Sequence, residues 1–184
     1  MLRPAYPLET DRLLLRPYRD EDLGALHEIE RLEGTARYLY NVPLDLDATR
    51  ALLERRKTLT EIDEEHDGLF LAAVLKETGT LIGHVNLEVK SREHRQGEIG
   101  YVLHPDHQGH GYATEAAAVM LRLGFEELDL HRIVGRLDAR NAASARVLER
   151  LGMRLEAHLR ENEFVKGEWV SELIYAVLAS EWRT

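Results

Sequence analysis

The sequence predicts an α/β fold: one domain over residues 1–184, with a mixed, mostly antiparallel sheet of about six or seven strands and about four helices. Short apolar runs typical of strands are interspersed with segments whose apolar residues recur every three or four positions, as in amphipathic helices. Three predicted strands follow one another with short connections, which indicates an antiparallel meander. A later strand is preceded by a helix and can run parallel to its neighbour. With 184 residues, 44% of them hydrophobic, the chain can bury one ordinary core.

The first half of the chain is predicted to contain a strand, two helices and then the three strands of the meander. The expected strands cover residues 12–18, 69–75, 81–90 and 98–103, and the expected helices begin near 20 and 45. Acidic residues open the helices, Asp20 and Asp22 the first, and Asp45 or Asp47 the second. On the second helix, the residues expected on the apolar side are Ala51, Leu52, Leu59 and Ile62.

The strand over residues 81–90 alternates between apolar and polar side chains, which predicts that its two sides face different surroundings. The apolar side carries Leu81, Gly83, Val85, Leu87 and Val89. The polar side carries His84, Asn86, Glu88 and Lys90. A turn over residues 77–80 joins this strand to the one before it as a hairpin.

The second half is predicted to hold two helices and three strands. The first helix has an apolar stripe between residues 113 and 128 that packs on the sheet, and a strand over 131–137 follows it. Asn141 is an expected N-cap for the last helix, and Gly152 stands where a left-handed residue ends a helix. Two final strands flank the turn at Lys166 and Gly167.

Composition and charge narrow the class of function. The net charge of -9 disfavours broad nucleic-acid binding, which depends on Lys and Arg, and weakly favours a cationic substrate such as an amine. No window approaches the roughly 18 apolar residues of a membrane span, and the N-terminus lacks the apolar core of a signal peptide. The lack of cysteine excludes disulfides and thiolate chemistry. We therefore expect a cytoplasmic protein whose partners are neither nucleic acid nor membrane.

The stretch Gly97–Glu115 (GEIGYVLHPDHQGHGYATE) combines a short apolar strand, a glycine-bearing loop and the start of a helix. Such a loop directs unpaired backbone N–H groups at one point, and the helix dipole favours an anion there. A simple tight turn is the alternative interpretation. A P-loop would need Lys and Ser or Thr after Gly111, and a dinucleotide fingerprint would need a third glycine and a later acid. Since neither pattern is found, we expect a phosphate site made of backbone amides without metal.

The segment Gln108–Ala113 (QGHGYA) resembles the Gln/Arg-x-x-Gly-x-Gly/Ala signature of the GNAT superfamily of acetyl-CoA-dependent N-acetyltransferases. The longer segments EIGYVLHPDHQGHGYATEA, NAASARVLERLGM and ETDRLLLRPY are similar to its RimJ/RimL-like branch. The resemblance covers the whole chain and implies a GNAT-like fold whose central strands splay apart. Met153 stands where Phe commonly follows Leu-Gly, a difference that concerns packing alone.

The resemblance implies that the co-substrate is acetyl-CoA and that its diphosphate binds the loop, where glycines let it approach the backbone. The residues expected to bind coenzyme A are Tyr101, Val102, Leu103, Gln108, Gly109, His110, Gly111, Tyr112, Ala113, Thr114 and Asn141. Of these, the strand residues 101–103 would offer backbone groups to the pantetheine arm. Asn141 would contact the same arm, a role that is compatible with capping the helix.

Acetyl transfer to an amine needs a neutral amine, a donor for the developing oxyanion and a proton for the departing thiolate. By the resemblance, the expected oxyanion donor is a backbone N–H near Val102. Ser144, one helical turn after Asn141, is the candidate acid, although its hydroxyl can instead bond within the helix. Glu163 is the preferred candidate base and Glu98 its rival, while either can be a solvated strand acid. Because the chain has no cysteine to carry an acyl group, we expect direct transfer in a ternary complex.

Two sets of residues allow more than one interpretation. His104, His107 and His110 are spaced three apart and suggest a metal site, but the loop gives this spacing no ordered geometry, so no metal is expected. Arg146 and Arg150 on the last helix can reach the 3′-phosphate of coenzyme A or can lie in solvent.

The acceptor stays open at this point. It can be the amine of a protein N-terminus or a small molecule such as an amine, an amino acid or an antibiotic. The loops over residues 33–43 and 91–96, where an acceptor would bind, carry no recognisable pattern. A coenzyme A sensor without catalysis and a partner-binding domain are the alternative functions, and a homodimer is compatible with the sequence.

Overall fold

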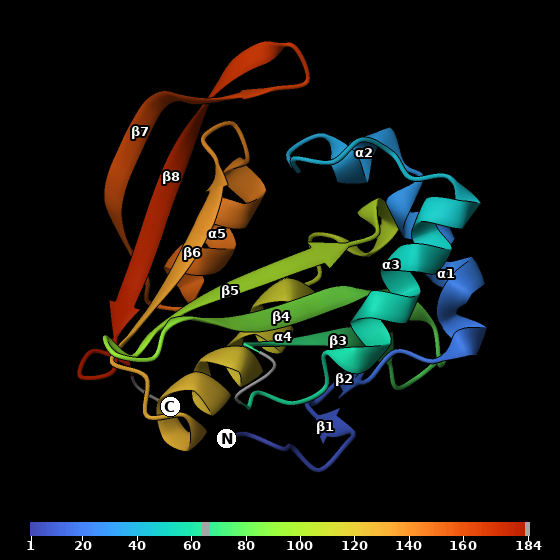
Figure 1. Ribbon diagram of the computed structural model, residues 1–184, viewed down its shortest axis with the longest axis horizontal. Helices are drawn as coiled ribbons and strands as arrows, with labels where there is room; N and C mark the ends of the chain where they lie inside the picture. Colours follow the sequence, from blue (N-terminus) through green and yellow to red (C-terminus); the bar gives the residue numbers. More distant parts are fainter. Residues whose placement is uncertain (64–66, 183–184) are drawn as a thin grey trace.

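The computed structural model describes residues 1–63 and 67–182, which form one eight-stranded sheet with helices on both faces (Figure 1). The strands lie in the order β1-β2-β3-β4-β5-β6-β8-β7. Neighbouring strands are antiparallel except for β5 and β6, which run parallel and have α4 between them in the chain. The predicted mixed, mostly antiparallel sheet and its parallel pair are therefore confirmed.

The strands follow the predicted ones closely, with one addition at the edge of the sheet. Their bounds are β1 Leu8–Glu9, β2 Leu13–Arg16, β3 Gly68–Leu75, β4 Leu81–Ser91, β5 Gln96–Leu103, β6 Arg132–Asp138, β7 Arg154–Val165 and β8 Glu168–Leu178. The addition is β1, which has 2 residues and is too short to show a periodic pattern in the sequence.

The helices have the predicted order, with a short extra helix after the first. Their bounds are α1 Leu23–Glu30, α2 Glu33–Ala36, α3 Leu46–Thr58, α4 Tyr112–Arg122 and α5 Ala142–Arg150. Single 3-10 turns lie at Asp20–Asp22 and Pro105–His107, and α4 continues into a π-helical turn over Leu123–Glu127.

The acids that open the first two helices have different roles. Asp45 accepts a hydrogen bond from the Ala48 N–H at 2.8 Å and caps α3, as one of the two predicted alternatives. Asp22 accepts two hydrogen bonds from the Arg16 guanidinium at 2.7 and 2.8 Å and one from the Arg19 N–H at 2.8 Å. It therefore ties β2 to the start of the first helical segment.

The prediction for the apolar side of α3 was wrong. The buried residues of α3 are Thr49, Leu53 and Arg56, whereas Ala51 is exposed and Leu52 and Leu59 are half-buried. Ile62 is fully buried but lies beyond the end of the helix, in a bridge with Leu2. The physical reason is Arg56, which turns inward to form an ion pair with the buried Glu30 of α1 and so rotates the buried face.

The two faces of the sheet bury different kinds of residue. On one face, α4 and α5 contribute Met120 and Leu148 to an apolar core with Leu87 and Ile133. On the other face, α1 and α3 form a smaller apolar cluster, and the polar side of β4 lies beneath that layer. His84 and Asn86 are only 6% and 8% exposed there. From Val85 onward the alternation along β4 therefore separates an apolar core from a buried polar surface. Leu81, predicted on the apolar side, instead packs in the smaller cluster on the other face, because the pairing of β3 with β4 shifts register at Val74.

The central strands splay apart, as the resemblance implies. The parallel pairing of β5 and β6 joins Gln96, Gly97 and Glu98 to Arg132, Ile133 and Val134. Beyond Glu98 the two strands diverge, and the opening between them widens toward the end of β5 (Figure 1). The opening links the two faces of the sheet and positions the site described next.

Candidate active site

The loop before α4 presents free backbone donors to a cavity. Gly109 and Gly111 adopt left-handed φ angles of 80° and 85°, which glycine reaches without strain. Gly111 is the N-cap of α4, and among the described residues no side chain caps this helix start. The N–H groups in the first turn of α4 therefore point outward at the positive end of the helix dipole, as an anion site requires.

The fit of a diphosphate to this loop rests on Thr114. Its hydroxyl Oγ1 is buried and has no hydrogen-bond partner within the described part of the chain. A buried polar atom without a partner is costly, and a phosphate oxygen bound at the helix start would satisfy it. A Cβ on Gly109 would meet no heavy atom of the described residues within 4 Å, so the loop is open on that side. Glycine-lined space, free amides and an unpaired hydroxyl together fit a diphosphate.

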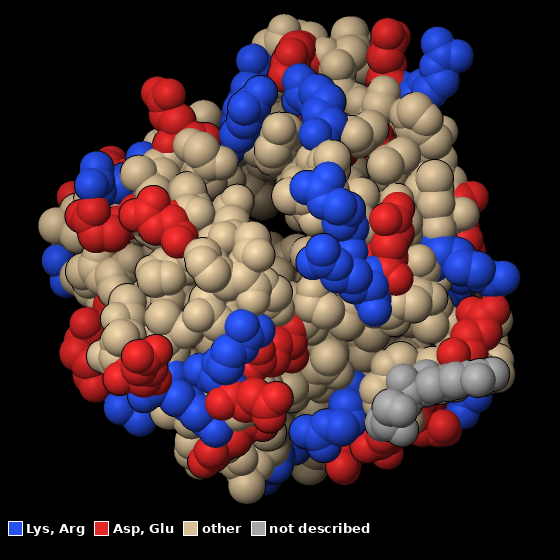
Figure 2. Space-filling view, turned by 180° about the vertical axis from the view of Figure 1, so that it is seen from behind, with Lys and Arg blue, Asp and Glu red and all other residues tan. Residues whose placement is uncertain are grey.

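A cavity of about 290 Å³ extends from this loop between β5 and α5. The predicted coenzyme A residues that line it are Tyr101, Val102, Leu103, Gln108, Gly109, Gly111, Tyr112, Ala113, Thr114 and Asn141. We call it the donor cavity. Arg146 and Arg150 also line it, and Figure 2 shows basic side chains beside a hollow on the face turned away from the viewer of Figure 1.

His110 is the exception among the predicted binding residues. Its ring stacks on that of Tyr112 with centroids 5.7 Å apart, and its carbonyl accepts a hydrogen bond from Arg12. It is not among the residues that line the donor cavity. His104 and His107 lie 6.0 Å apart with their rings edge to face. His110 therefore packs on Tyr112 of the loop, whereas His104 and His107 contact each other.

Hydrogen bonds hold the walls of the donor cavity in place. The Gln108 side chain donates to the Leu103 carbonyl at 3.1 Å and fastens the loop to the end of β5. Asn141 accepts from the Ser144 N–H at 3.1 Å, which makes it the predicted N-cap of α5. The Tyr101 hydroxyl donates to the Ser144 carbonyl at 3.0 Å and so bridges the splay. Burial raises the pKa of Tyr101, which keeps this hydroxyl protonated.

A second cavity of about 630 Å³ lies on the other face of the sheet, beneath α1 and α3. Its polar wall includes His84, Asn86, Glu88 and Glu98. We call it the acceptor cavity. The residues that line both cavities are Tyr38, Leu39, Tyr101, Val102, Asn141 and Ser144. A donor and an acceptor bound on opposite faces of the sheet would therefore meet at the splay, beside the backbone of Val102 and the side chain of Ser144.

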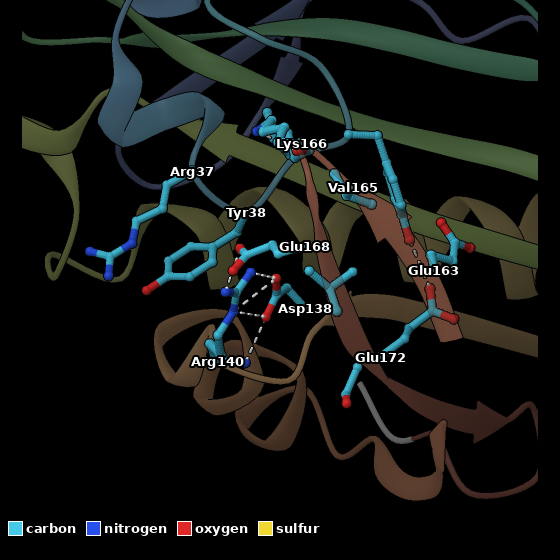
Figure 3. A pocket seen from close by; sticks show the side chains of 13 residues that line it. Arg37, Tyr38, Asp138, Arg140, Glu163, Val165, Lys166, Glu168 and Glu172 are labelled. Carbon is cyan, nitrogen blue, oxygen red and sulfur yellow. Dashed lines mark hydrogen bonds and ion pairs between the residues drawn. The ribbon is translucent and has the colours of Figure 1, made fainter. Parts of the chain in front are cut away.

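The two candidate bases occupy different places. Glu98 lines the acceptor cavity with its side chain 25% exposed, and its carboxylate lies 3.9 Å from the Lys90 ammonium. Burial raises the pKa of the Glu98 carboxyl, with Lys90 opposing the change. Glu163 lines a much smaller pocket of about 30 Å³ between the loop after α2 and the β7–β8 hairpin. Figure 3 shows it beside Glu172.

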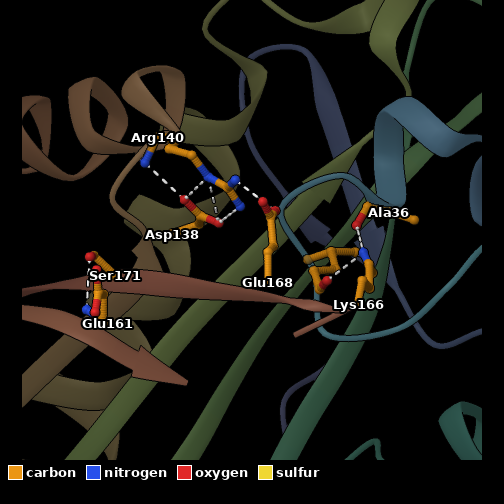
Figure 4. Close-up of polar contacts among 8 residues, drawn as sticks. Ala36, Asp138, Arg140, Glu161, Lys166, Glu168 and Ser171 are labelled. Atoms are coloured by element: carbon orange, nitrogen blue, oxygen red, sulfur yellow. Dashed lines mark hydrogen bonds and ion pairs between the residues drawn. The ribbon is translucent and has the colours of Figure 1, made fainter. Parts of the chain in front are cut away.

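The segment after α2 contributes residues that the sequence analysis leaves out. Tyr38 and Leu39 line both cavities, and Lys166 at the tip of the β7–β8 hairpin donates to the carbonyls of Ala36 and Leu39 (Figure 4). Tyr40 donates to Glu172 at 3.3 Å, and burial together with nearby Glu172 and Glu163 raises its pKa to about 12. The hydrogen bonds of Lys166 and Tyr40 fasten the segment after α2 to the β7–β8 hairpin, across the opening between β5 and β6. The one local signal in the sequence is a lysine in a hairpin turn, and this pattern does not indicate which residues the lysine contacts.

The described part of the chain includes no helix that is both long and apolar enough to cross a membrane.

A loop of free amides that fits a diphosphate, a splayed parallel strand pair and two cavities that meet at the splay are together the features that a group-transfer enzyme requires. The comparison with known families agrees with this class. Residues 12–154 match the family model described as "Acetyltransferase (GNAT) domain", and the chain belongs to this family. It is an N-acetyltransferase, and acetyltransferases of this family use acetyl-CoA as the donor.

Relatives support the assignment over most of the chain. The protein is similar to the uncharacterized N-acetyltransferase YnaD of Bacillus subtilis (strain 168), 31% identical over 175 residues that cover 95% of this chain and 98% of the relative. It is 27% identical to the spermidine N(1)-acetyltransferase of Escherichia coli (strain K12), over 84% of this chain and 80% of that one. The crystal structure of a GNAT-family acetyltransferase from Bacillus anthracis has a TM-score of 0.83 at 30% identity and covers 95% of this chain and 99% of its own.

Proposed function

We propose that this enzyme transfers the acetyl group of acetyl-CoA directly to a primary amine, with both substrates bound at once. The observation that carries the proposal is the meeting of two cavities at the splay, because it gives donor and acceptor separate entrances and a common point of contact. Holding two reactants in this way supplies much of the rate enhancement of a bimolecular transfer. No acyl-enzyme is needed, and the chain contains no cysteine to form one.

In this proposal the donor cavity binds coenzyme A along its length. The amides of residues 109–114 and the Thr114 hydroxyl receive the diphosphate, and the backbone of residues 101–103 with Asn141 receives the pantetheine arm. Arg146 and Arg150 on α5 receive the 3′-phosphate. When bound, acetyl-CoA supplies an activated thioester. His110 acts through its stacking on Tyr112, since its ring lies outside the cavity wall.

For the chemistry, a backbone N–H near Val102 stabilises the developing oxyanion and the Ser144 hydroxyl donates a proton to the departing thiolate. Val102 and Ser144 both line the junction of the two cavities, which supports these roles. For the base we place Glu98 before Glu163 and thereby reverse the order that the sequence favours. Glu98 lines the acceptor cavity, and its raised pKa brings it closer to that of an efficient proton acceptor near neutral pH.

The acceptor is a primary amine of one of two kinds. The RimJ/RimL-like motifs favour the N-terminal amine of a protein. The name of the Escherichia coli relative favours a polyamine, and the carboxylates Glu88 and Glu98 on one wall of the acceptor cavity are compatible with a cationic chain. Of these, we place the small cationic amine first, since the segment that Lys166 holds lines the acceptor cavity and leaves less room there for a folded protein.

The proposal is tested by release of free thiol from acetyl-CoA with a panel of spermidine, single amino acids and peptides with free N-termini. Catalysis with one class of amine is the expected result. Binding of coenzyme A without thiol release for any amine would instead indicate the sensor. Glu98→Gln should lower kcat by about 100- to 10,000-fold, the range for loss of a general base, with coenzyme A affinity unchanged. Full activity of Glu98→Gln with loss of activity in Glu163→Gln would return the base to Glu163.

A further inference from the structure

The first turn of α4, whose N–H groups would receive the proposed diphosphate, carries a carboxylate, Glu115, which is not among the residues that line the donor cavity. An acidic side chain at a helix start is favourable to the free helix, because it interacts with the positive end of the dipole. Beside a bound diphosphate the same charge is repulsive. A partner that neutralises Glu115 would therefore favour a diphosphate bound at this helix start.

A segment from the far edge of the sheet receives this carboxylate. Glu115 Oε1 accepts from the Thr10 hydroxyl at 2.5 Å and from the Arg12 N–H at 2.8 Å. Glu115 Oε2 lies 2.7 Å from Arg12 Nε and 2.6 Å from Nη2, so two guanidinium nitrogens converge on this one carboxylate oxygen in a charge-assisted contact. Burial raises the pKa of Glu115, but the bonds from Thr10 and Arg12 outweigh it and the pKa lies below its ordinary value. Glu115 is thus ionised and fully engaged with residues 10–12.

Arg12 also contacts the diphosphate loop itself. Its Nη1 donates to the His110 carbonyl at 2.9 Å, between the two left-handed glycines. Its guanidinium lies over the Tyr112 ring at 4.5 Å, and that ring stacks in turn on His110. Its Nη2 lies 3.4 Å from the place that a Cβ on Gly111 would occupy. The Arg12 side chain therefore contacts the loop at the His110 carbonyl and the Tyr112 ring, and it contacts α4 through Glu115.

We infer that Arg12 is a positioning residue for the donor site, which holds the loop over residues 109–114 in its binding conformation and neutralises Glu115 beside the diphosphate. The inference rests on the proposed binding of coenzyme A at this loop. Preorganisation matters here because amides that must first be ordered lose affinity to that ordering. Arg12 itself need not touch the ligand, since it acts through the loop and through Glu115.

The test compares donors with and without a diphosphate in the full-length protein. Arg12→Ala should weaken coenzyme A binding, measured by calorimetry, by about 10-fold, the scale of a lost charge-assisted hydrogen bond. Transfer from S-acetyl-pantetheine, which lacks the diphosphate, should stay within about twofold of wild type at equal concentration. The coenzyme A affinity of Arg12→Lys should lie between those of wild type and Arg12→Ala, since lysine keeps the charge and loses the planar guanidinium.

Two further variants separate neutralisation from general damage. The double variant Arg12→Ala/Glu115→Gln should bind coenzyme A more tightly than Arg12→Ala alone, because no unpaired carboxylate then remains in the first turn of the helix that receives the diphosphate. Arg95→Ala is the matched control, since Arg95 is 50% exposed in an ion pair with Asp129, against 47% for Arg12. It should leave both donors unaffected. Equal losses with both donors in Arg12→Ala, or no gain in the double variant, would overturn the inference.

A measurement on the ligand-free protein keeps the inference testable if coenzyme A proves not to be the ligand. The Glu115 N–H donates to the Gly111 carbonyl at 3.0 Å and closes the first turn of α4. In Arg12→Ala the hydrogen exchange of this amide should be about 10-fold faster, because the turn has lost its anchor. Unchanged exchange would show that Arg12 does not hold the loop. Failure of wild type to bind coenzyme A would instead overturn the proposed function.

Discussion

The donor cavity offers its ligand backbone N–H groups from the loop over residues 109–114, whereas the acceptor cavity is walled by polar and charged side chains from many elements. That loop and the adjoining end of β5 form one wall of the donor cavity, and residues of α5, α2 and the segment after α2 form the rest. The acceptor side combines Glu30 of α1, Arg56 of α3, His84 of β4 and Glu98 of β5. A backbone cradle binds any diphosphate of suitable shape, while a wall of side chains can vary with the acceptor. This difference separates binding of the donor, which can stay constant, from binding of the acceptor, which can vary.

The charge balance differs in the same way. On the acceptor side, charges are paired with each other: Arg56 Nη1 lies 3.1 Å from Oε1 of Glu30, both buried, and the exposed Arg136 donates to the buried Glu172 at 3.0 and 2.6 Å. On the donor side, Arg146 and Arg150 face the cavity. Breaking the buried pair on the acceptor side would therefore cost stability, whereas the arginines on the donor side face a cavity and are open to a ligand. The predictions below test this contrast.

Arg56→Met should have the largest effect on stability. It leaves Glu30, 3% exposed, as a buried charge without its partner, which typically costs about 3–5 kcal/mol of unfolding free energy. The measurement is urea unfolding at pH 7. Arg31→Met is the control, because the exposed Arg31–Glu28 pair is worth about 1 kcal/mol or less. A loss for Arg56→Met no larger than the control would contradict the idea that this side stabilises the fold.

Gly111→Ala should weaken the donor side with a smaller effect. The φ angle of 85° is left-handed, and a Cβ there costs about 1–2 kcal/mol, so coenzyme A affinity should fall about 10-fold as the loop adjusts. Gly79→Ala is a matched control: Gly79 has φ 70° in the turn between β3 and β4 and does not line the donor cavity. It should lose similar stability and keep coenzyme A affinity. Equal affinities for the two variants would count against the cradle.

Arg146→Ala and Arg150→Ala should act on a single group of the ligand. If they receive the 3′-phosphate, the double variant binds coenzyme A about 10-fold more weakly and binds dephospho-coenzyme A as well as wild type does. Calorimetry with both ligands makes the comparison. Arg154→Ala, in a surface pair with Glu181, is the control. A similar loss with both ligands would indicate that the arginines support α5 or the adenosine instead.

The contrast also explains what the sequence could predict. The glycine loop, the N-cap Asn141 and the parallel strand pair are encoded by neighbouring residues, since turns, caps and periodicity are local properties. Their positions are confirmed by the φ angles of the loop, the bond to Ser144 and the register of β5 with β6. The ranking of the bases could not be settled in this way. Glu98 and Glu163 both read as polar strand residues, and only the course of the sheet places Glu98 in the larger cavity.

Long-range polar contacts could not be predicted from the sequence for the same reason. Arg56 reads as a surface residue in a charged helix, yet it is buried against Glu30 and alters which side of α3 faces inward. Arg12 and Glu115 are 103 positions apart, and no spacing rule links them. A side chain that pairs across the fold leaves no periodic trace, so such contacts are learned from the structure.

The smallest predicted effect concerns the stability of Glu98→Gln as pH changes. Burial raises the pKa of Glu98 in the folded protein, so the folded state holds this proton more tightly than the unfolded state does. Wild type therefore loses stability relative to Glu98→Gln as pH rises from the ordinary glutamate value through the raised pKa, and the loss is complete above it. At pH 7.5 we expect the variant to be more stable by no more than about 1 kcal/mol.

The same comparison repeated at pH 4 should show the difference closing, because Glu98 is then largely protonated in both states. Thermal unfolding at the two pH values measures it, with Glu163→Gln, on β7, as the control. A gain in stability together with a loss of activity would mark Glu98 as a carboxylate kept for function, as expected of a base on the acceptor side. A stability difference that does not change with pH would mean that the buried charge of Glu98 does not destabilise the wild type. That result would weaken the case for Glu98 over Glu163 as the base.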